Sequence, residues 1–281
     1  MRTSCPSMAR KMFLAAFLLF SISLICVGQT AWTPELEMKV KAVGAVRVSP
    51  DGKKVAYTVS GPVMTPEKSE FVTQIWSANT DGTDAVQLTY ADKSSDNPRW
   101  SPDGKMLAFT SGRSGKTNLY VLRLVGGESE QLTDVKSAVG NFAWSPDGTR
   151  IAFVMREAPS EEEEKGNKGK DDWKWIDENV KLSRLNVVSL AKDANGKREP
   201  RTLTKEGNIE GDFDWSPDSK RIVFTRTRMP KADYWTTSDL SAVDVTSGAV
   251  KTLVATNASE SSPAFSPDGK WISFLVSDDP P

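Results

Sequence analysis

Residues 100–109 read Trp-Ser-Pro-Asp-Gly-Lys-Met-Leu-Ala-Phe, and the Ser-Pro-Asp-Gly tetrad inside this stretch recurs along the chain. Proline sets φ for a turn, aspartate hydrogen-bonds the local backbone, and glycine accepts the left-handed conformation that closes a hairpin. Four tetrads and a Ser-Pro-Asp-Ser variant begin at Ser49, Ser101, Ser145, Ser266 and, for the variant, Ser216. We therefore predict five turns, each capped by its aspartate: Asp51, Asp103, Asp147, Asp218 and Asp268.

Apolar residues flank the tetrads at fixed distances. The residue before each serine is Val48, Trp100, Trp144, Trp215 or Phe265. The residues six and eight positions after it are Val55 and Tyr57, Leu107 and Phe109, Ile151 and Phe153, Ile222 and Phe224, or Ile272 and Phe274. A two-residue step places both side chains on one face of a strand. The fixed position of the tryptophans favours packing between repeats over a peptide-binding surface.

A second repeated motif, a leucine followed by threonine or valine, indicates that each repeat holds four strands. Leu88-Thr89, Leu132-Thr133, Leu203-Thr204 and Leu253-Val254 each begin 13 residues before the next tetrad serine. A strand-like run, such as 119–124, lies between the tetrad and this motif. Units of four antiparallel strands at a period of about 45 to 50 residues are typical of a β-propeller. The predicted fold is an all-β propeller over residues 46–281, with about four and a half blades.

The N-terminal 29 residues have the features of a secretory signal peptide. Arg2, Arg10 and Lys11 precede an apolar run over residues 12–27, which is shorter than the roughly 20 residues of a spanning helix. We expect export to the periplasm or the exterior, with no stable membrane insertion after cleavage. Residues 30–45 are expected to form a linker with a short helix, capped by Thr33 with Pro34 at its first position.

The composition excludes several kinds of chemistry. The chain has no histidine, so a Ser-His-Asp triad and a histidine-ligated metal site are excluded, and it has no Gly-x-Ser-x-Gly elbow or phosphate-binding loop. Its two cysteines, Cys5 and Cys26, both lie in the leader. Without the leader, 33 basic residues face 37 acidic ones, which argues against nucleic-acid binding. We expect no cofactor and no metal, while a pair of catalytic carboxylates, defined only by spatial separation, stays open.

The third repeat carries a charged insertion at about 157–181. Its first half, with acidic residues 161–164 and basic residues among 165–170, is predicted to be a solvated loop. Strand alternation places this insertion at the end of the propeller opposite the tetrad turns. The long segment 61–72 occupies the same position in the first repeat and is predicted to be a surface loop.

The stretches 100–109 and 144–153 resemble the repeats of prolyl oligopeptidase-family serine peptidases and of the TolB propeller. The opening Trp32-Thr33-Pro34-Glu35-Leu36 is similar to the start of the peptidases, including their dipeptidyl and acylaminoacyl branches. The resemblance implies seven or eight blades, followed by an α/β-hydrolase domain that carries the catalytic residues. Candidate substrate-binding residues are Trp173, Trp175, Asp177 and Glu178, which are similar to a segment that holds the substrate amine in dipeptidyl peptidases, although at a different blade position.

Two functions follow as hypotheses. The first is the substrate-filtering propeller of an exported serine peptidase, with peptides as substrates and no catalytic residue in this chain. The alternative is a free-standing propeller similar to TolB that binds a protein partner. Because the fifth repeat stops after its second strand, we expect the chain to be a fragment or a truncated product.

Overall fold

The computed structural model describes residues 33–169, 179–234 and 236–277. The chain divides after Val40 into two compact units, and the first contributes the short helix α2 (Pro34–Glu37). The Leu36 amide donates to the Thr33 hydroxyl over 3.3 Å, and Pro34 occupies the first turn. This is the helix that the sequence predicts after Thr33.

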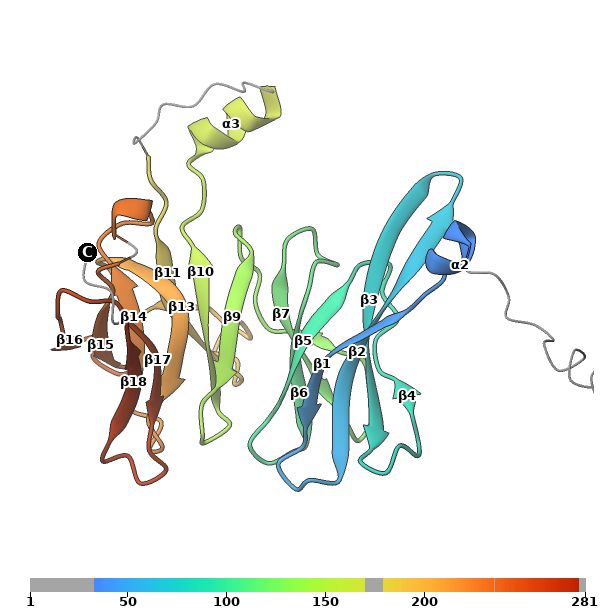
Figure 1. Cartoon of the computed structure of the whole chain (residues 1–281), viewed down its shortest axis with the longest axis horizontal. Helices are drawn as coiled ribbons and strands as arrows, with labels where there is room; N and C mark the ends of the chain where they lie inside the picture. Colours follow the sequence, from blue (N-terminus) through green and yellow to red (C-terminus); the bar gives the residue numbers. More distant parts are fainter. Residues whose placement is uncertain (1–32, 170–178, 235, 278–281) are drawn as a thin grey trace, which may run out of the picture. The chain divides into compact units, whose positions relative to one another are not determined.

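The described residues of the second unit form four sheets of four antiparallel strands and a final sheet of two strands (Figure 1). Blade 1 contains β1 (Ala42–Val48), β2 (Lys54–Thr65), β3 (Lys68–Asn79) and β4 (Val86–Gln87). Blade 2 contains β5 (Ser95–Trp100), β6 (Met106–Ser111), β7 (Asn118–Arg123) and β8 (Glu130–Gln131). Blade 3 contains β9 (Val139–Trp144), β10 (Arg150–Arg156), β11 (Ser183–Ser189) and β12 (Arg201–Thr202). Blade 4 contains β13 (Asn208–Trp215), β14 (Arg221–Thr227), β15 (Asp239–Asp244) and β16 (Val250–Val254), and blade 5 contains β17 (Glu260–Phe265) and β18 (Ile272–Val276).

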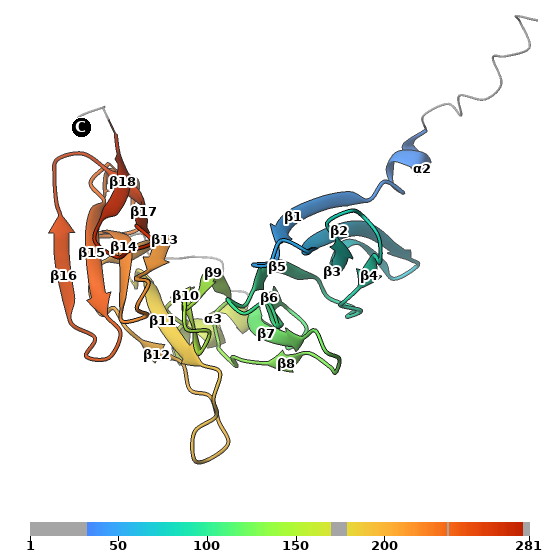
Figure 2. The same cartoon turned by 90° about the horizontal axis from the view of Figure 1, so that it is seen from below.

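The strand order within each blade is the order of the chain, and the blades are arranged as in a propeller. First strands contact the neighbouring blade, as β1 does with β5 and β13 does with both β9 and β17. Figure 2 shows these first strands on the inner side and the fourth strands, such as β8 and β16, on the outer side. The prediction of four and a half propeller blades is confirmed.

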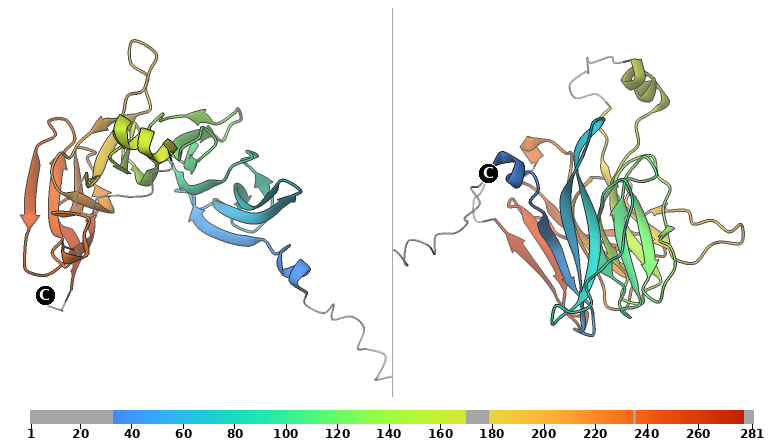
Figure 3. Two further views of the ribbon diagram at one scale, coloured as in Figure 1. Left: turned by 90° about the horizontal axis from the view of Figure 1, so that it is seen from above. Right: turned by 90° about the vertical axis from the view of Figure 1, so that its right-hand side faces the viewer.

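The loops separate into two ends. All tetrad turns lie at one end, and the connections between second and third strands lie at the other, as strand alternation requires (Figure 1). The helix α3 (Glu161–Gly169) and the 3-10 helix η1 (Ala232–Tyr234) belong to these connections in blades 3 and 4. The far end of the β2–β3 hairpin projects at the same end (Figure 3, right).

The hydrophobic core lies between blades. One cluster joins blades 1 and 2, a second joins blades 2 and 3, and a third joins blades 3 and 4. Six of the apolar residues predicted to follow the tetrads are completely buried in these clusters: Leu107, Phe109, Ile151, Phe153, Ile222 and Phe224. Val55 and Tyr57 of blade 1 are half-buried, because no described blade packs against their face.

Two segments differ from the sequence-based expectation. Residues 161–169 form α3 rather than a solvated loop, because Ser160 and Glu163 cap the helix reciprocally and four glutamates occupy its favourable first turn. Segment 61–72 continues β2 and β3 as a regular hairpin, with register pairs as far as Thr65 and Lys68. Among the described residues, no helix is long and apolar enough to cross a membrane.

Candidate functional site

The tetrad aspartates have a structural role in the turns. In blade 2, the Ser101 hydroxyl donates to Asp103 over 2.6 Å and accepts from the Met106 amide over 2.9 Å. The Lys105 amide also donates to Asp103, and Gly104 has a φ of 69°. The same hydrogen bond from the tetrad serine reaches the other four aspartates, Asp51, Asp147, Asp218 and Asp268. These serine hydroxyls lower the pKa of Asp51, Asp103, Asp218 and Asp268 below its ordinary value, so the carboxylates remain ionised acceptors.

Asp147 is the most perturbed of these acids. Burial is the largest influence and opposes ionisation, but hydrogen bonds from Ser145 and Thr149 and the charge of Arg150 lower its pKa to about 2. The variant serine of the next blade reinforces this turn. Ser219 has a φ of 59° and accepts the Asp147 amide on its hydroxyl over 3.0 Å, while Arg150 donates to the Ser219 carbonyl over 2.8 Å. In the fourth turn, Ser219 therefore stands where the other turns have glycine, and its hydroxyl forms a hydrogen bond to the preceding blade.

The tryptophans before the tetrads join consecutive blades. The Trp100 indole N–H donates to the Arg47 carbonyl over 2.9 Å, and the Trp144 indole donates to the Arg99 carbonyl over 3.1 Å. Trp215 repeats the contact with Ala143 over 3.3 Å. Each acceptor is two residues before the tetrad serine of the preceding blade. These indoles therefore belong to interblade packing, as the sequence predicts.

The end opposite the tetrad turns holds the long connections, and we call it the loop face: residues 61–72, 157–182 and 228–238. The predicted substrate-binding residues Trp173, Trp175, Asp177 and Glu178 belong to it by sequence, but they lie outside the described residues. Their role therefore stays a prediction.

The base of the blade 3 insertion is held by Glu157. Its carboxylate accepts the Leu182 amide over 3.1 Å and Arg184 Nε over 2.7 Å, and its own amide donates to the Leu182 carbonyl. Burial acts to raise the pKa of Glu157, but the Leu182 amide and the Arg184 guanidinium outweigh it, so the pKa is lowered. Lys181 further pairs with Glu163 of α3 over 2.8 Å. Sequence reasoning missed this clamp because the two ends are about 25 residues apart and neither belongs to a repeat.

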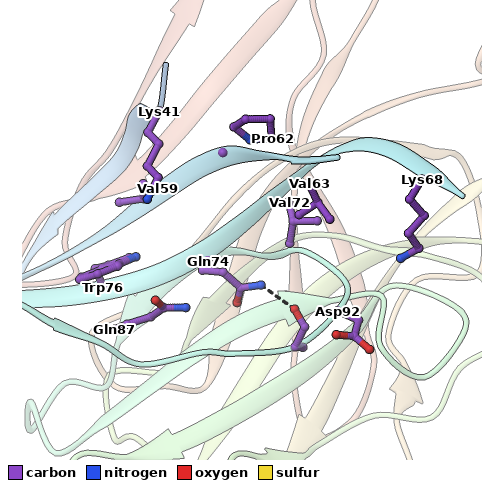
Figure 4. Close-up of a pocket in the computed structure, with 12 residues that line it drawn as sticks. Lys41, Val59, Pro62, Val63, Lys68, Val72, Gln74, Trp76, Gln87 and Asp92 are labelled. Carbon is purple, nitrogen blue, oxygen red and sulfur yellow. Dashed lines mark hydrogen bonds between the residues drawn. The ribbon is translucent and has the colours of Figure 1, made fainter. Parts of the chain in front are cut away.

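A pocket of about 300 Å³ lies beside the β2–β3 hairpin (Figure 4). Val59, Val72 and Trp76 supply its apolar wall, and Lys41, Lys68 and Asp92 supply charge. Gln74 lies at its floor, where its side-chain amide donates to the Ala91 carbonyl over 2.7 Å. This pocket is on the face of blade 1 that does not pack against blade 2, and its lining contains no paired nucleophile and base.

Two carboxyl groups meet where blade 4 contacts blade 5. Glu260 of β17 is completely buried, and its Oε2 has no hydrogen-bond partner, while Oε1 accepts from the Thr256 hydroxyl. Burial, and then the charge of Glu260, raise the pKa of Asp239 on β15. Among the described residues, no group of three or more acidic, histidine or cysteine side chains is arranged to hold a metal ion.

Comparison with known proteins also relates this chain to β-propellers. Residues 35–178 match the family model described as the TolB beta propeller domain. The chain belongs to this family. Related sequences that are named as peptidases extend the likeness beyond the matched residues.

The Bacillus subtilis relative, "Uncharacterized peptidase YuxL", is 30% identical over 227 residues, which is 80% of this chain and 28% of that protein. Dipeptidyl-peptidase 5 of Porphyromonas endodontalis is 25% identical over 265 residues, covering 86% of this chain and 38% of that protein. The chain therefore spans only about a third of the length of these relatives. An acylaminoacyl peptidase structure, solved with Z-Gly-Gly-Phe-chloromethyl ketone, shares the fold with a TM-score of 0.57 at 16% identity, over 88% of this chain and 40% of that one.

Proposed function

We propose that this chain is the substrate-filtering β-propeller portion of an exported prolyl oligopeptidase-like serine peptidase. The observation that carries the proposal is the alignment of most of the chain with two relatives named as peptidases. The sequence contains no histidine, so the hydrolase domain with its catalytic triad would lie outside these 281 residues. Residues 1–29 would act as the export signal.

The filtering mechanism would be steric. Blades joined by buried clusters and indole hydrogen bonds form a stiff wall, which admits short peptides and excludes large proteins. The clamped insertion with α3, and the β2–β3 hairpin, extend this wall at the loop face. Trp173, Trp175, Asp177 and Glu178 would contact the peptide there.

The first test is to read the gene beyond codon 281 and to label its full product with a fluorophosphonate probe. A Gly-x-Ser-x-Gly elbow, a downstream histidine and covalent labelling are expected, whereas the 281-residue chain alone should hydrolyse no chromogenic peptide. Hydrolysis by the 281-residue chain would contradict the proposal.

The filter itself is tested in the full product by replacing residues 158–181 with a short Gly-Ser linker. Cleavage of a long unfolded polypeptide should rise relative to cleavage of a dipeptide substrate. The matched control replaces the exposed loop 192–197 between β11 and β12, which lies at the tetrad end and should leave the ratio unchanged. An equal change in both variants would argue against filtering at the loop face.

A second candidate is a free-standing interaction propeller similar to TolB, which the matched family description supports. It predicts that the gene ends without a hydrolase domain and that the exported chain retains one defined protein partner. The gene sequence separates the two candidates directly.

A further inference from the structure

Two arginines occupy the inner edge of the propeller next to the tetrad turns. Arg47 on β1 and Arg99 on β5 each stand two residues before a tetrad serine. Their strand partners are Ala56 and Ala108, both completely buried. Paired residues share a sheet face, and Ala108 belongs to the cluster shared with blade 3. Arg99 therefore lies on the face of blade 2 that packs against blade 3.

Neither guanidinium has an acidic partner in the part of the chain that the structure describes. Among the described residues, no carboxylate lies within ion-pair distance of Arg47 or Arg99, and Arg47 donates only to the Val46 carbonyl. The Nε of Arg99 is buried without any acceptor. Buried donors in native proteins are nearly always satisfied, and a half-buried charge without a partner is costly. A buried donor without an acceptor therefore calls for an explanation, and an anion that binds there would supply the acceptor.

The equivalent positions of the other blades show that the fold does not require arginine there. Blade 3 has Ala143 and blade 5 has Ala264, while Asp214 of blade 4 accepts the Phe265 amide over 2.8 Å. The Trp144 indole bonds to the backbone carbonyl of Arg99, so this contact does not use the side chain. The strands β1 and β5, which carry the two arginines, contact each other. Burial, and then the charge of Arg47, lower the pKa of Arg99.

We propose that Arg47 and Arg99 form a binding site for a carboxylate group of a peptide at the inner wall of blades 1 and 2. A guanidinium presents a planar fork of donors that matches the two oxygens of a carboxylate. A single carboxylate fits this site better than a polyanion does. The inner strand of blade 4 carries Glu210, Asp212 and Asp214, whose negative charges would repel a ligand with many negative charges. This inference rests on the proposed peptide role, and it adds that the peptide is recognised through its negative charge.

The test titrates the full chain with three pentapeptides, while ¹⁵N spectra follow the arginine Nε–H signals. The probes are pentaalanine with a free carboxyl terminus, its carboxyl-terminal amide, and Ala-Ala-Glu-Ala-Ala amide. The free acid should shift the Arg99 Nε–H signal saturably, and the pentaalanine amide should not. Comparable binding of the glutamate peptide would identify side-chain carboxylates as a source, and its absence would restrict the site to the carboxyl terminus. Both results support the site.

Substitutions provide the second readout. Arg99→Gln should weaken binding of the free-acid peptide about tenfold, as loss of a charged hydrogen bond implies, and Arg99→Lys should restore part of it. Arg47→Gln changes an exposed side chain, so it tests the site without risk to folding. Arg123→Gln on β7, also exposed, removes the same charge away from the inner wall and should have no effect.

Three results would overturn the proposal. Equal binding of the free-acid and amide forms of pentaalanine would refute carboxylate recognition but leave the peptide role standing. Equal effects of Arg99→Gln and Arg123→Gln would exclude Arg99 from the site. Failure of all three peptides to bind would contradict the site but not the steric filter, which needs no bound peptide and is tested by the gene sequence and the fluorophosphonate label.

Discussion

Replacing Trp144 with phenylalanine isolates the hydrogen bond that joins blade 3 to blade 2. The ring is 8% exposed within the cluster of blades 2 and 3, and its N–H donates to the Arg99 carbonyl over 3.1 Å. Phenylalanine retains most of the apolar contact but loses the donor. A hydrogen bond contributes about 0.5–1.5 kcal/mol net. We therefore expect Trp144→Phe to lower the free energy of unfolding by about 0.5–1.5 kcal/mol.

The measurement is urea denaturation followed by far-ultraviolet circular dichroism, since fluorescence itself changes with the tryptophan. Trp271→Phe is the matched control, because Trp271 is 75% exposed and makes no such bond; it should change stability by less than about 0.5 kcal/mol. Trp215→Phe, with its longer 3.3 Å contact, should fall between the two. If Trp144→Phe costs no more than Trp271→Phe, the indole bonds do not contribute to blade association.

Three further predictions concern acidic residues. Glu260→Ile should raise the midpoint of urea denaturation, because it removes a buried carboxylate oxygen that has no partner and because Ile209 holds the equivalent register position in blade 4. Asp147→Asn should reduce stability at pH 7 and have progressively less effect as the pH falls from about 4 towards 2, because the stabilisation from a depressed pKa is complete above the unfolded value and is lost through the folded one; midpoints at several pH values measure this. Glu157→Gln should speed tryptic cleavage within residues 158–181, because it weakens the clamp to Leu182 and Arg184.

Each of these has its own contrary result. An unchanged or lower midpoint for Glu260→Ile would mean that the buried carboxylate is favourable where it stands. A constant difference between Asp147→Asn and the parent from pH 7 to pH 2 would exclude ionisation as the cause. For the insertion, Glu128→Gln at an exposed site is the control, and equal cleavage of both variants would dismiss the clamp.

The repeats explain why so much of the fold is predictable. Local chemistry within each tetrad dictates its hairpin, and the apolar residues that follow keep a period of two, so strands, turns and buried faces all follow from short-range patterns. Ser219 shows the limit of this reasoning, because its bond to Asp147 joins residues 72 positions apart. The indole acceptors are backbone carbonyls, which no residue type reveals.

The loop face was less predictable, because its segments belong to no repeat. The helix α3 depends on a capping box at Ser160 and Glu163, a signal present in the sequence but outweighed there by the run of charge. The hairpin of residues 61–72 contains glycine and proline, which usually end strands, yet its cross-strand register continues to the tip. Arg47 and Arg99 could not be identified from the sequence, because only the structure shows that no described acidic residue pairs with them.

The indole bonds all run in one direction, from a blade to the carbonyl of the blade made before it. When a chain emerges from the ribosome, each new blade therefore meets an acceptor that is already in place, and it presents an acceptor of its own to the blade that follows. Stability in such a stack accumulates from neighbour to neighbour. The propeller is thus suited to vectorial assembly, in which the first blade serves as the template for the order of all the others.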